Sequence, residues 1–169
     1  MKKLKLGVSS CLLGESVRYN GEHKRDSTVI DLLGQQFEAV PVCPEVELGM
    51  GVPREPVRLV ANDASSERMV GSESGKDWTQ AMVDFNSIKL EALRQQNLSG
   101  FIFKSRSPSC GRGNVPLHHE QEKSSTVGLF AHALMQYFPS LPVIDEEALQ
   151  DEIVRQDFVA RVIQYGEKV

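Results

Sequence analysis

Short apolar runs alternate with amphipathic stretches along the chain, and this alternation predicts an α/β protein. Four apolar runs predict strands at residues 4–9, 37–43, 99–105 and 141–145. Two further runs, PVRLV and ERMVG, flank the turn-like NDASS and predict a hairpin over 56–71. We therefore expect a single Rossmann-like domain over residues 1–169, with a mainly parallel sheet flanked by helices and a small β-hairpin insertion.

Four stretches carry apolar residues at helical spacing and predict helices over 26–36, 77–97, 124–138 and 146–166. Ser27 is the expected N-cap of the first helix, and Asp145 is the expected N-cap of the last one. The stretch GRGNVPLHHEQEKS, residues 111–124, is the longest expected loop.

The three cysteines of the chain fall at equivalent places in this pattern. Cys11 comes shortly after the first predicted strand, Cys43 ends the second, and Cys110 follows the GFIF run. If these strands are parallel, their carboxyl ends share one edge of the sheet, where open α/β sheets bind ligands. We therefore expect three thiols that are distant in the sequence to converge in space.

The composition excludes several classes of function. The formal net charge is −4, which argues against a nucleic-acid partner. No apolar run approaches the length of a membrane span, so no membrane partner is expected. The N-terminal MKKLKLGVSS predicts a strand rather than a signal peptide, because serines interrupt its apolar run. An odd number of cysteines excludes a closed disulfide framework, and we expect a cytoplasmic protein.

Three thiolates without a histidine partner suit a soft metal. A structural zinc site uses four ligands, commonly in C-x₂-C pairs, and the chain has no such pair. A [4Fe–4S] cluster with only three cysteine ligands would keep one iron open, as catalytic metals do.

The segments beside the cysteines carry candidate chemistry. Glu45 in CPE is a candidate general acid or base. The loop KSRSPSCG supplies the hydroxyls of Ser105, Ser107 and Ser109 and the cations Lys104 and Arg106 as possible substrate contacts. A solvated turn is the alternative interpretation of that loop. A basic cluster near Cys11 is either solvated or an anion contact at the mouth of the site; it consists of Arg18, His23, Lys24 and Arg25.

The segments SSCLLGESVRYNGEHK, PVCPEVELGMGVPREPVRL and KSRSPSCG together resemble the thiouracil desulfidase-like family, also known as domain of unknown function 523. The resemblance implies a [4Fe–4S] cluster held by Cys11, Cys43 and Cys110. It implies a non-redox reaction that converts a thiolated pyrimidine such as 2-thiouracil, as base or nucleoside, to uracil and sulfide. It further implies a proton-transfer role for Glu45.

The resemblance also implies a catalytic serine in SPSC. Ser107 is the first choice and Ser109 the second, and Ser109, Lys104 and Ser105 are expected to contact the substrate. Two alternatives stay open from the sequence. One is a metal-free persulfide carrier using Cys110, whose thiol the cations Lys104 and Arg106 would activate. The other is a non-enzymatic iron–sulfur sensor module, in which Glu45→Gln would have no effect.

Overall fold

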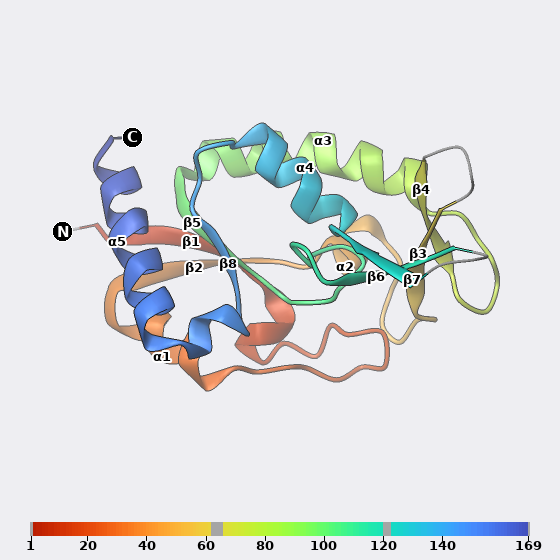
Figure 1. Ribbon diagram of the computed structural model, residues 1–169, viewed down its shortest axis with the longest axis horizontal. Coiled ribbons are helices and arrows are strands. Elements are labelled where there is room, and N and C mark those ends of the chain that lie inside the picture. The colour runs from red at the N-terminus through yellow and green to blue at the C-terminus, as the bar shows by residue number, and fades with distance from the viewer. Residues whose placement is uncertain (1, 62–65, 120–122, 169) are drawn as a thin grey trace.

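A four-stranded parallel sheet forms the centre of the molecule (Figure 1). The structure is a computed structural model that describes residues 2–61, 66–119 and 123–168. The sheet has the strand order β2-β1-β5-β8, with β1 at Leu4–Ser9, β2 at Phe37–Val42, β5 at Leu98–Phe103 and β8 at Val143–Asp145. Ser9 pairs with Val42, and Phe103 pairs with Asp145, so neighbouring strands end along the same edge. The predicted α/β class with a mainly parallel sheet is thus confirmed.

Helices cover both faces of this sheet (Figure 1). On one face, α1 (Ser27–Gln36) and α5 (Glu152–Lys168) share a buried cluster with β1. On the other, α3 (Thr79–Gln96) and α4 (Leu129–Tyr137) pack against a second cluster. A sheet covered on both faces needs apolar residues on both faces of its strands, which explains the continuous apolar runs in the sequence.

Strand β5 shows this double burial most clearly, because all six of its residues are buried. Phe101 and Phe103 stack with their ring centroids 4.4 Å apart and belong to the cluster that includes α3 and α4. Ile102, between them, belongs to the cluster that includes α1 and α5. A Cβ atom on Gly7 of the neighbouring strand would lie 2.3 Å from the Phe101 ring, so only glycine fits beside it.

A second sheet lies at one end of the molecule, away from both termini (Figure 1). Its order is β4-β3-β6-β7, with β3 at Val57–Ala61, β4 at Glu67–Gly71, β6 at Val115–His118 and β7 at Lys123–Thr126. The predicted hairpin is present as the antiparallel pair β3–β4, and residues 62–65 of its predicted turn lie outside the described residues. The sheet is larger than that hairpin, since β6 joins β3 in parallel and β7 completes it.

The predicted loop over 111–124 and the predicted helix over 124–138 are both partly wrong. The loop contains β6, and residues 124–126 of the predicted helix belong to β7, which pairs with β6. Helix α4 begins only at Leu129, because Gly128 before it has an extended ψ of 148° and serves as its N-cap. Residues 120–122 of the predicted loop lie outside the described residues.

The predicted N-caps of two helices differ from the observed ones, although Asp145 accepts from the Ala148 N–H at 2.9 Å and so caps the turn that precedes the closing helix. Helix α1 is capped by Asp26 rather than Ser27, since the Asp26 carboxylate accepts a hydrogen bond from the Val29 N–H at 3.0 Å. The closing helix α5 begins at Glu152, after a 3₁₀ turn at Ala148–Gln150 labelled η2. Asp151 caps α5, because its carboxylate accepts from the N–H groups at positions 153 and 154.

No helix among the described residues is long and apolar enough to cross a membrane.

Candidate functional site

The carboxyl edge of the parallel sheet opens into a cavity of about 280 Å³ that all three cysteines line. Cys11 lies in the 3₁₀ turn η1 (Ser10–Leu13), which directly follows β1. Cys43 directly follows β2 and is the N-cap of the short helix α2 (Pro44–Leu48). Cys110 lies in the loop that leaves β5. The predicted convergence of the three cysteines is therefore present in the structure.

Local backbone contacts hold the first two cysteines in place. The turn of Cys11 ends at Gly14, whose φ of 91° suits glycine, and the Cys11 carbonyl accepts from the Lys24 N–H at 3.0 Å. The Cys43 N–H donates to the Glu47 carboxylate at 2.9 Å, and the Glu47 N–H donates back to the Cys43 carbonyl. The second of these bonds is the first i→i−4 bond of α2, and the first gives the N–H of the N-cap residue an acceptor, so Glu47 fixes the entry to α2.

Ser107 shapes the loop that carries the third cysteine. Its hydroxyl oxygen accepts from the N–H groups of Ser109 at 3.2 Å and Cys110 at 3.1 Å. Its carbonyl accepts from the Gly111 N–H at 2.8 Å. Ser107 lines the cavity, and within the described part of the chain its hydroxyl group accepts these hydrogen bonds without donating one, so its proton is available for another partner.

Helix α4 anchors the same loop from outside the cavity. The N–H groups of Gly128, Leu129 and Ala131 donate to carbonyls of the loop at 2.6, 3.0 and 2.9 Å; the acceptors are Gly111, Pro108 and Ser109. The first turn of a helix has N–H groups without intrahelical partners, and here the loop provides the acceptors. The position of Cys110 is thus tied to the start of α4.

Burial makes thiolates unfavourable in this cavity when no metal is bound. Desolvation raises the pKa of Cys11 to about 11, and the Lys104 ammonium opposes this shift. Desolvation also raises the pKa of Cys43, and it raises that of Cys110 well above its usual value. Charge repulsion from Cys43 also raises the pKa of Cys11, and repulsion from Cys11 and Cys43 raises that of Cys110, so the three thiols are close enough to interact.

The donor set fits a metal cluster better than a single ion. Within the described ranges, no group of three or more His, Cys, Asp and Glu side chains is close enough to hold one metal ion. Three soft thiol donors around a cavity suit a polynuclear iron–sulfur group, which spans a larger distance between its ligands. A bound cation would also stabilise the thiolate forms that burial alone disfavours.

Glu45 lies at this cavity, held by two partners. Its Oε1 atom lies 3.2 Å from Arg54 Nε, and its Oε2 atom accepts from the Ser109 hydroxyl at 2.8 Å. The Arg54 and Glu45 side chains are only 7% and 13% exposed. Ser109 is buried and does not line the cavity; it contacts Glu45, which does. Ser107 lines the cavity directly.

Arg54 is not among the site residues that the sequence predicted. It lies in the irregular segment between α2 and β3, where neither periodicity nor spacing marks a partner for Glu45. The only signal was local: an arginine between two prolines in the same motif as Cys43 and Glu45.

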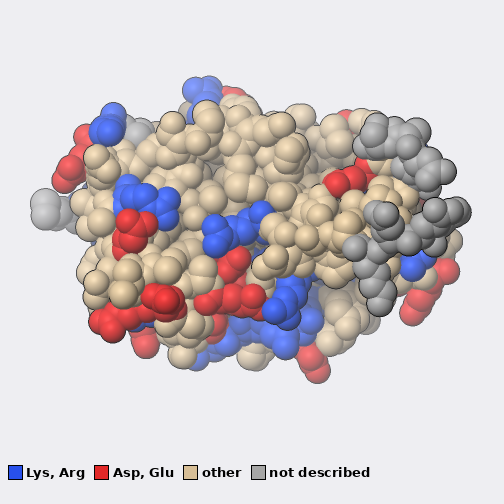
Figure 2. Space-filling model, in the orientation of Figure 1, with Lys and Arg blue, Asp and Glu red and all other residues tan. Residues whose placement is uncertain are grey.

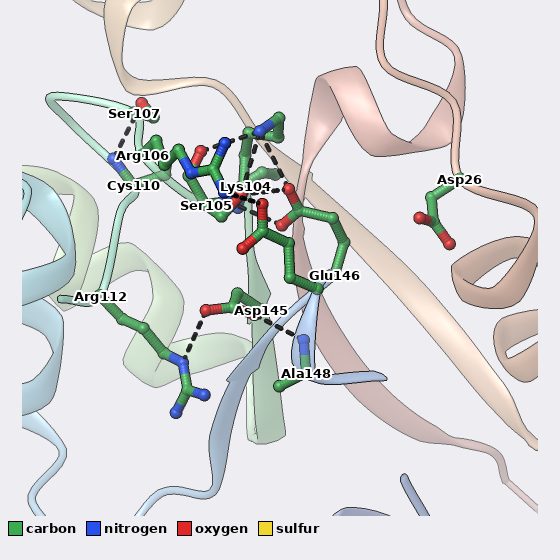
Figure 3. A network of polar contacts seen from close by, with 12 residues as sticks. Asp26, Lys104, Ser105, Arg106, Ser107, Cys110, Arg112, Asp145, Glu146 and Ala148 are labelled. Atoms are coloured by element: carbon green, nitrogen blue, oxygen red, sulfur yellow. Dashed lines mark hydrogen bonds and ion pairs between the residues drawn. The ribbon is translucent and has the colours of Figure 1, made fainter. Parts of the chain in front are cut away.

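A buried carboxylate organises Lys104 and Ser105 (Figure 3). Glu146, directly after β8, accepts from the Ser105 N–H at 2.7 Å and from the Ser105 hydroxyl at 2.5 Å. The same carboxylate lies 2.9 Å from Lys104 Nζ. Lys104 and Ser105, the expected substrate contacts, both line the cavity, and their polar groups also have this structural partner. Next to it, Asp145 holds Arg112 at 3.0 Å.

The remaining cations around the cavity are paired to different degrees. Arg106 lies 2.9 Å from Glu147 at the surface, and basic and acidic groups adjoin on the face shown in Figure 2. Arg18 lines the cavity, has the exposed Glu22 at 3.9 Å and stacks over Tyr19. The other members of the predicted basic cluster do not line the cavity; they are His23, Lys24 and Arg25.

Known proteins share this arrangement of motifs and strands. The family model described as 2-thiouracil desulfurase matches residues 6–146, a range that includes all three cysteines. The chain is 34% identical over 112 residues to the uncharacterized protein YbbK of Bacillus subtilis (strain 168), covering 64% of this chain and 74% of YbbK. The solved structure of the [4Fe–4S]-dependent thiouracil desulfidase TudS is 33% identical and superposes with a TM-score of 0.67, covering 88% of this chain and 94% of TudS.

Proposed function

This chain belongs to the 2-thiouracil desulfurase family, and on that premise we propose that it is a [4Fe–4S]-dependent desulfidase. Its substrate would be a thiolated pyrimidine such as 2-thiouracil, as base or nucleoside, and its products would be the corresponding oxo-pyrimidine and sulfide. The observation that carries the proposal is the meeting of Cys11, Cys43 and Cys110 at one cavity.

The three cysteines would hold the cluster in this proposal. When bound, a cluster with one iron free of protein ligands supplies a sulfur-seeking Lewis acid. The cavity of about 280 Å³ would have to hold both the cluster and the substrate, which suits a single pyrimidine ring rather than a polymer.

The residues of the chain would supply the proton transfers. Replacing C=S by C=O consumes one water and releases H₂S, so the water must lose both of its protons while the departing sulfur gains two. Glu45 would take a proton of the attacking water, and its lining of the cavity with carboxylate lone pairs left over supports this role. Ser107, which also lines the cavity, would donate a hydrogen bond to the substrate, and Ser109 would act on the substrate only through Glu45.

The geometry disfavours a metal-free persulfide carrier that uses Cys110. That role needs an accessible thiolate with a low pKa. Cys110 is only 4% exposed, and burial raises the pKa of its thiol. The cations expected to activate it, Lys104 and Arg106, lie beside the carboxylates of Glu146 and Glu147 instead.

Anaerobic purification followed by iron, sulfide and activity assays tests the proposal. We expect about four irons per chain and sulfide release from 2-thiouracil or 4-thiouracil. Single Cys→Ser changes at positions 11, 43 and 110 should each lower the iron content. Glu45→Gln should keep the iron and reduce turnover by roughly 10²–10⁴-fold, while the exposed control Glu38→Gln should keep both.

Three results would contradict parts of the proposal. Unchanged iron content in all three cysteine variants would exclude them as ligands. Full iron without sulfide release from any thiolated pyrimidine would favour the sensor alternative. Normal turnover of Glu45→Gln would remove its proton-transfer role.

A further inference from the structure

Arg54 is held at three points beside the cavity, although it lies in an irregular segment. Its backbone N–H donates to the Tyr19 carbonyl at 2.7 Å. Its Nη1 group donates to the Gly51 carbonyl at 2.9 Å, and its Nε group donates to Glu45 at 3.2 Å. A long flexible side chain that is fixed in this way and only 7% exposed can hold a partner in one orientation.

We propose that Arg54 is a positioning residue that fixes the Glu45 carboxylate for proton transfer, an inference that rests on the proposed function. The carboxylate is held at both oxygens, by Arg54 at Oε1 and by the Ser109 hydroxyl at Oε2. Two partners on opposite oxygens remove rotation about the last side-chain bond. The lone pairs that remain on each oxygen then point in fixed directions, one set being available to a water in the cavity.

The charge of Arg54 also helps to hold the Glu45 carboxylate in place. A carboxylate that is only 13% exposed has lost most of its contact with water and needs a close cation or hydrogen-bond donors in its place. The other cations that line the cavity lie near other carboxylates: Lys104 is paired with Glu146, Arg106 with Glu147, and Arg18 has Glu22 at 3.9 Å. Among the described residues, Arg54 is therefore the ion-pair partner of Glu45.

A residue that acts only through Glu45 makes a specific kinetic prediction. Arg54→Met should lower kcat by roughly 100-fold, the loss typical of a catalytic group displaced by about 1 Å, while KM and iron content change little. Arg54→Lys keeps the charge but not the fork geometry and should recover part of that loss. In a Glu45→Gln background, Arg54→Met should cause no further loss beyond about threefold, because the group it positions is already inactive.

The double-mutant cycle uses the cluster-loaded, full-length chain with 2-thiouracil as the probe. Arg161→Met, which removes an arginine from an exposed ion pair with Asp157, is the matched control and should keep parental kcat. The uncharged pair of Glu45→Gln with Arg54→Met leaves no isolated buried charge, so it stays informative if Arg54→Met alone folds poorly. Crystal structures of parent and Arg54→Lys should show one Glu45 orientation and several orientations, respectively.

Three outcomes would overturn the positioning role. They are parental kcat in Arg54→Met, a double variant whose loss is the product of both single losses, and an unchanged Glu45 orientation in Arg54→Lys. Failure of the proposed function looks different. If the loaded parent releases no sulfide, the activity proposal fails, and the crystal structures alone then decide whether Arg54 orients Glu45.

Discussion

Replacing Gly128 by alanine should push the cysteine-bearing loop away from helix α4. A Cβ atom on Gly128 would lie 2.6 Å from the carbonyl carbon and oxygen of Ser109 and 2.9 Å from the Cys110 nitrogen. All three contacts are with backbone, which cannot rotate away as the end of a side chain can. Gly128 has a φ of −59°, which any residue adopts, so the substitution adds volume without adding backbone strain.

The size of the effect follows from this overlap. Ordinary contacts of a Cβ atom begin at 3.4 Å, so the loop or the helix must move by about 0.8 Å, from 2.6 to 3.4 Å. Overpacking of this kind costs about 1–3 kcal/mol of the free energy of unfolding. The movement also stretches the hydrogen bonds from Gly128 and Ala131 to loop carbonyls. Because Cys110 belongs to this loop, a shift approaching 1 Å should reduce turnover by roughly 100-fold.

Gly113→Ala is the matched control in the same loop. No atom lies within 4 Å of a Cβ built there, and Gly113 is exposed. Urea unfolding and sulfide release should both be measured anaerobically. Gly128→Ala should be less stable and turn over more slowly than the parent, whereas the free energy of unfolding of Gly113→Ala should change by no more than about 0.5 kcal/mol. Equal stability and equal turnover of the two variants would refute the argument that α4 sets the position of the cysteine loop.

Three smaller predictions concern single polar contacts. Hydrogen bonds from Thr79 are the largest of the contacts that lower the pKa of Asp77 from 3.8 to about 2. Their stabilisation is therefore present above about pH 4 and is lost as the pH falls through 2. The free energy of unfolding in urea should differ less between pH 5 and pH 2 in Asp77→Asn than in the parent. Asp151→Ala removes the N-cap of α5 and should cost about 1 kcal/mol in urea unfolding, and an unchanged midpoint would contradict the cap. Ser107→Ala leaves the Cys110 N–H without its acceptor and should lower iron content, whereas Ser107→Thr should keep it; equal iron content in both would show that the hydroxyl does not hold the loop.

The sequence predicted the central sheet well because double burial leaves a strong pattern. A strand covered on both faces has to be mostly apolar, and the GFIF run within the six buried residues of β5 is visible in the sequence. The second sheet was harder to predict from the sequence. Strand β6 has only four residues, which alternate between buried and exposed and include Pro116. Such a short alternating run, placed in a segment rich in glycine and histidine, was therefore assigned to a loop.

The meeting of the three cysteines was predictable for a topological reason. Parallel strands bring their carboxyl ends to one edge whatever the distance between them in the sequence. Cys11 and Cys43 lie within two residues of a strand end, and Cys110 lies seven residues beyond one. Strand assignment alone was therefore enough to bring them together, without knowledge of strand order.

The partners that orient the site follow no comparable rule. Glu146 reaches Ser105 across 41 positions because β8 happens to pair with β5, and Arg54 reaches Glu45 from a segment without regular structure. A buried carboxylate must find donors, but the sequence does not say which donors face it, since that depends on strand order and on loop geometry. The positions of the three cysteines thus follow from where the strands end along the chain. The orientation of Glu45 follows from buried polar pairs, and mutations of these contacts should change turnover without changing iron content.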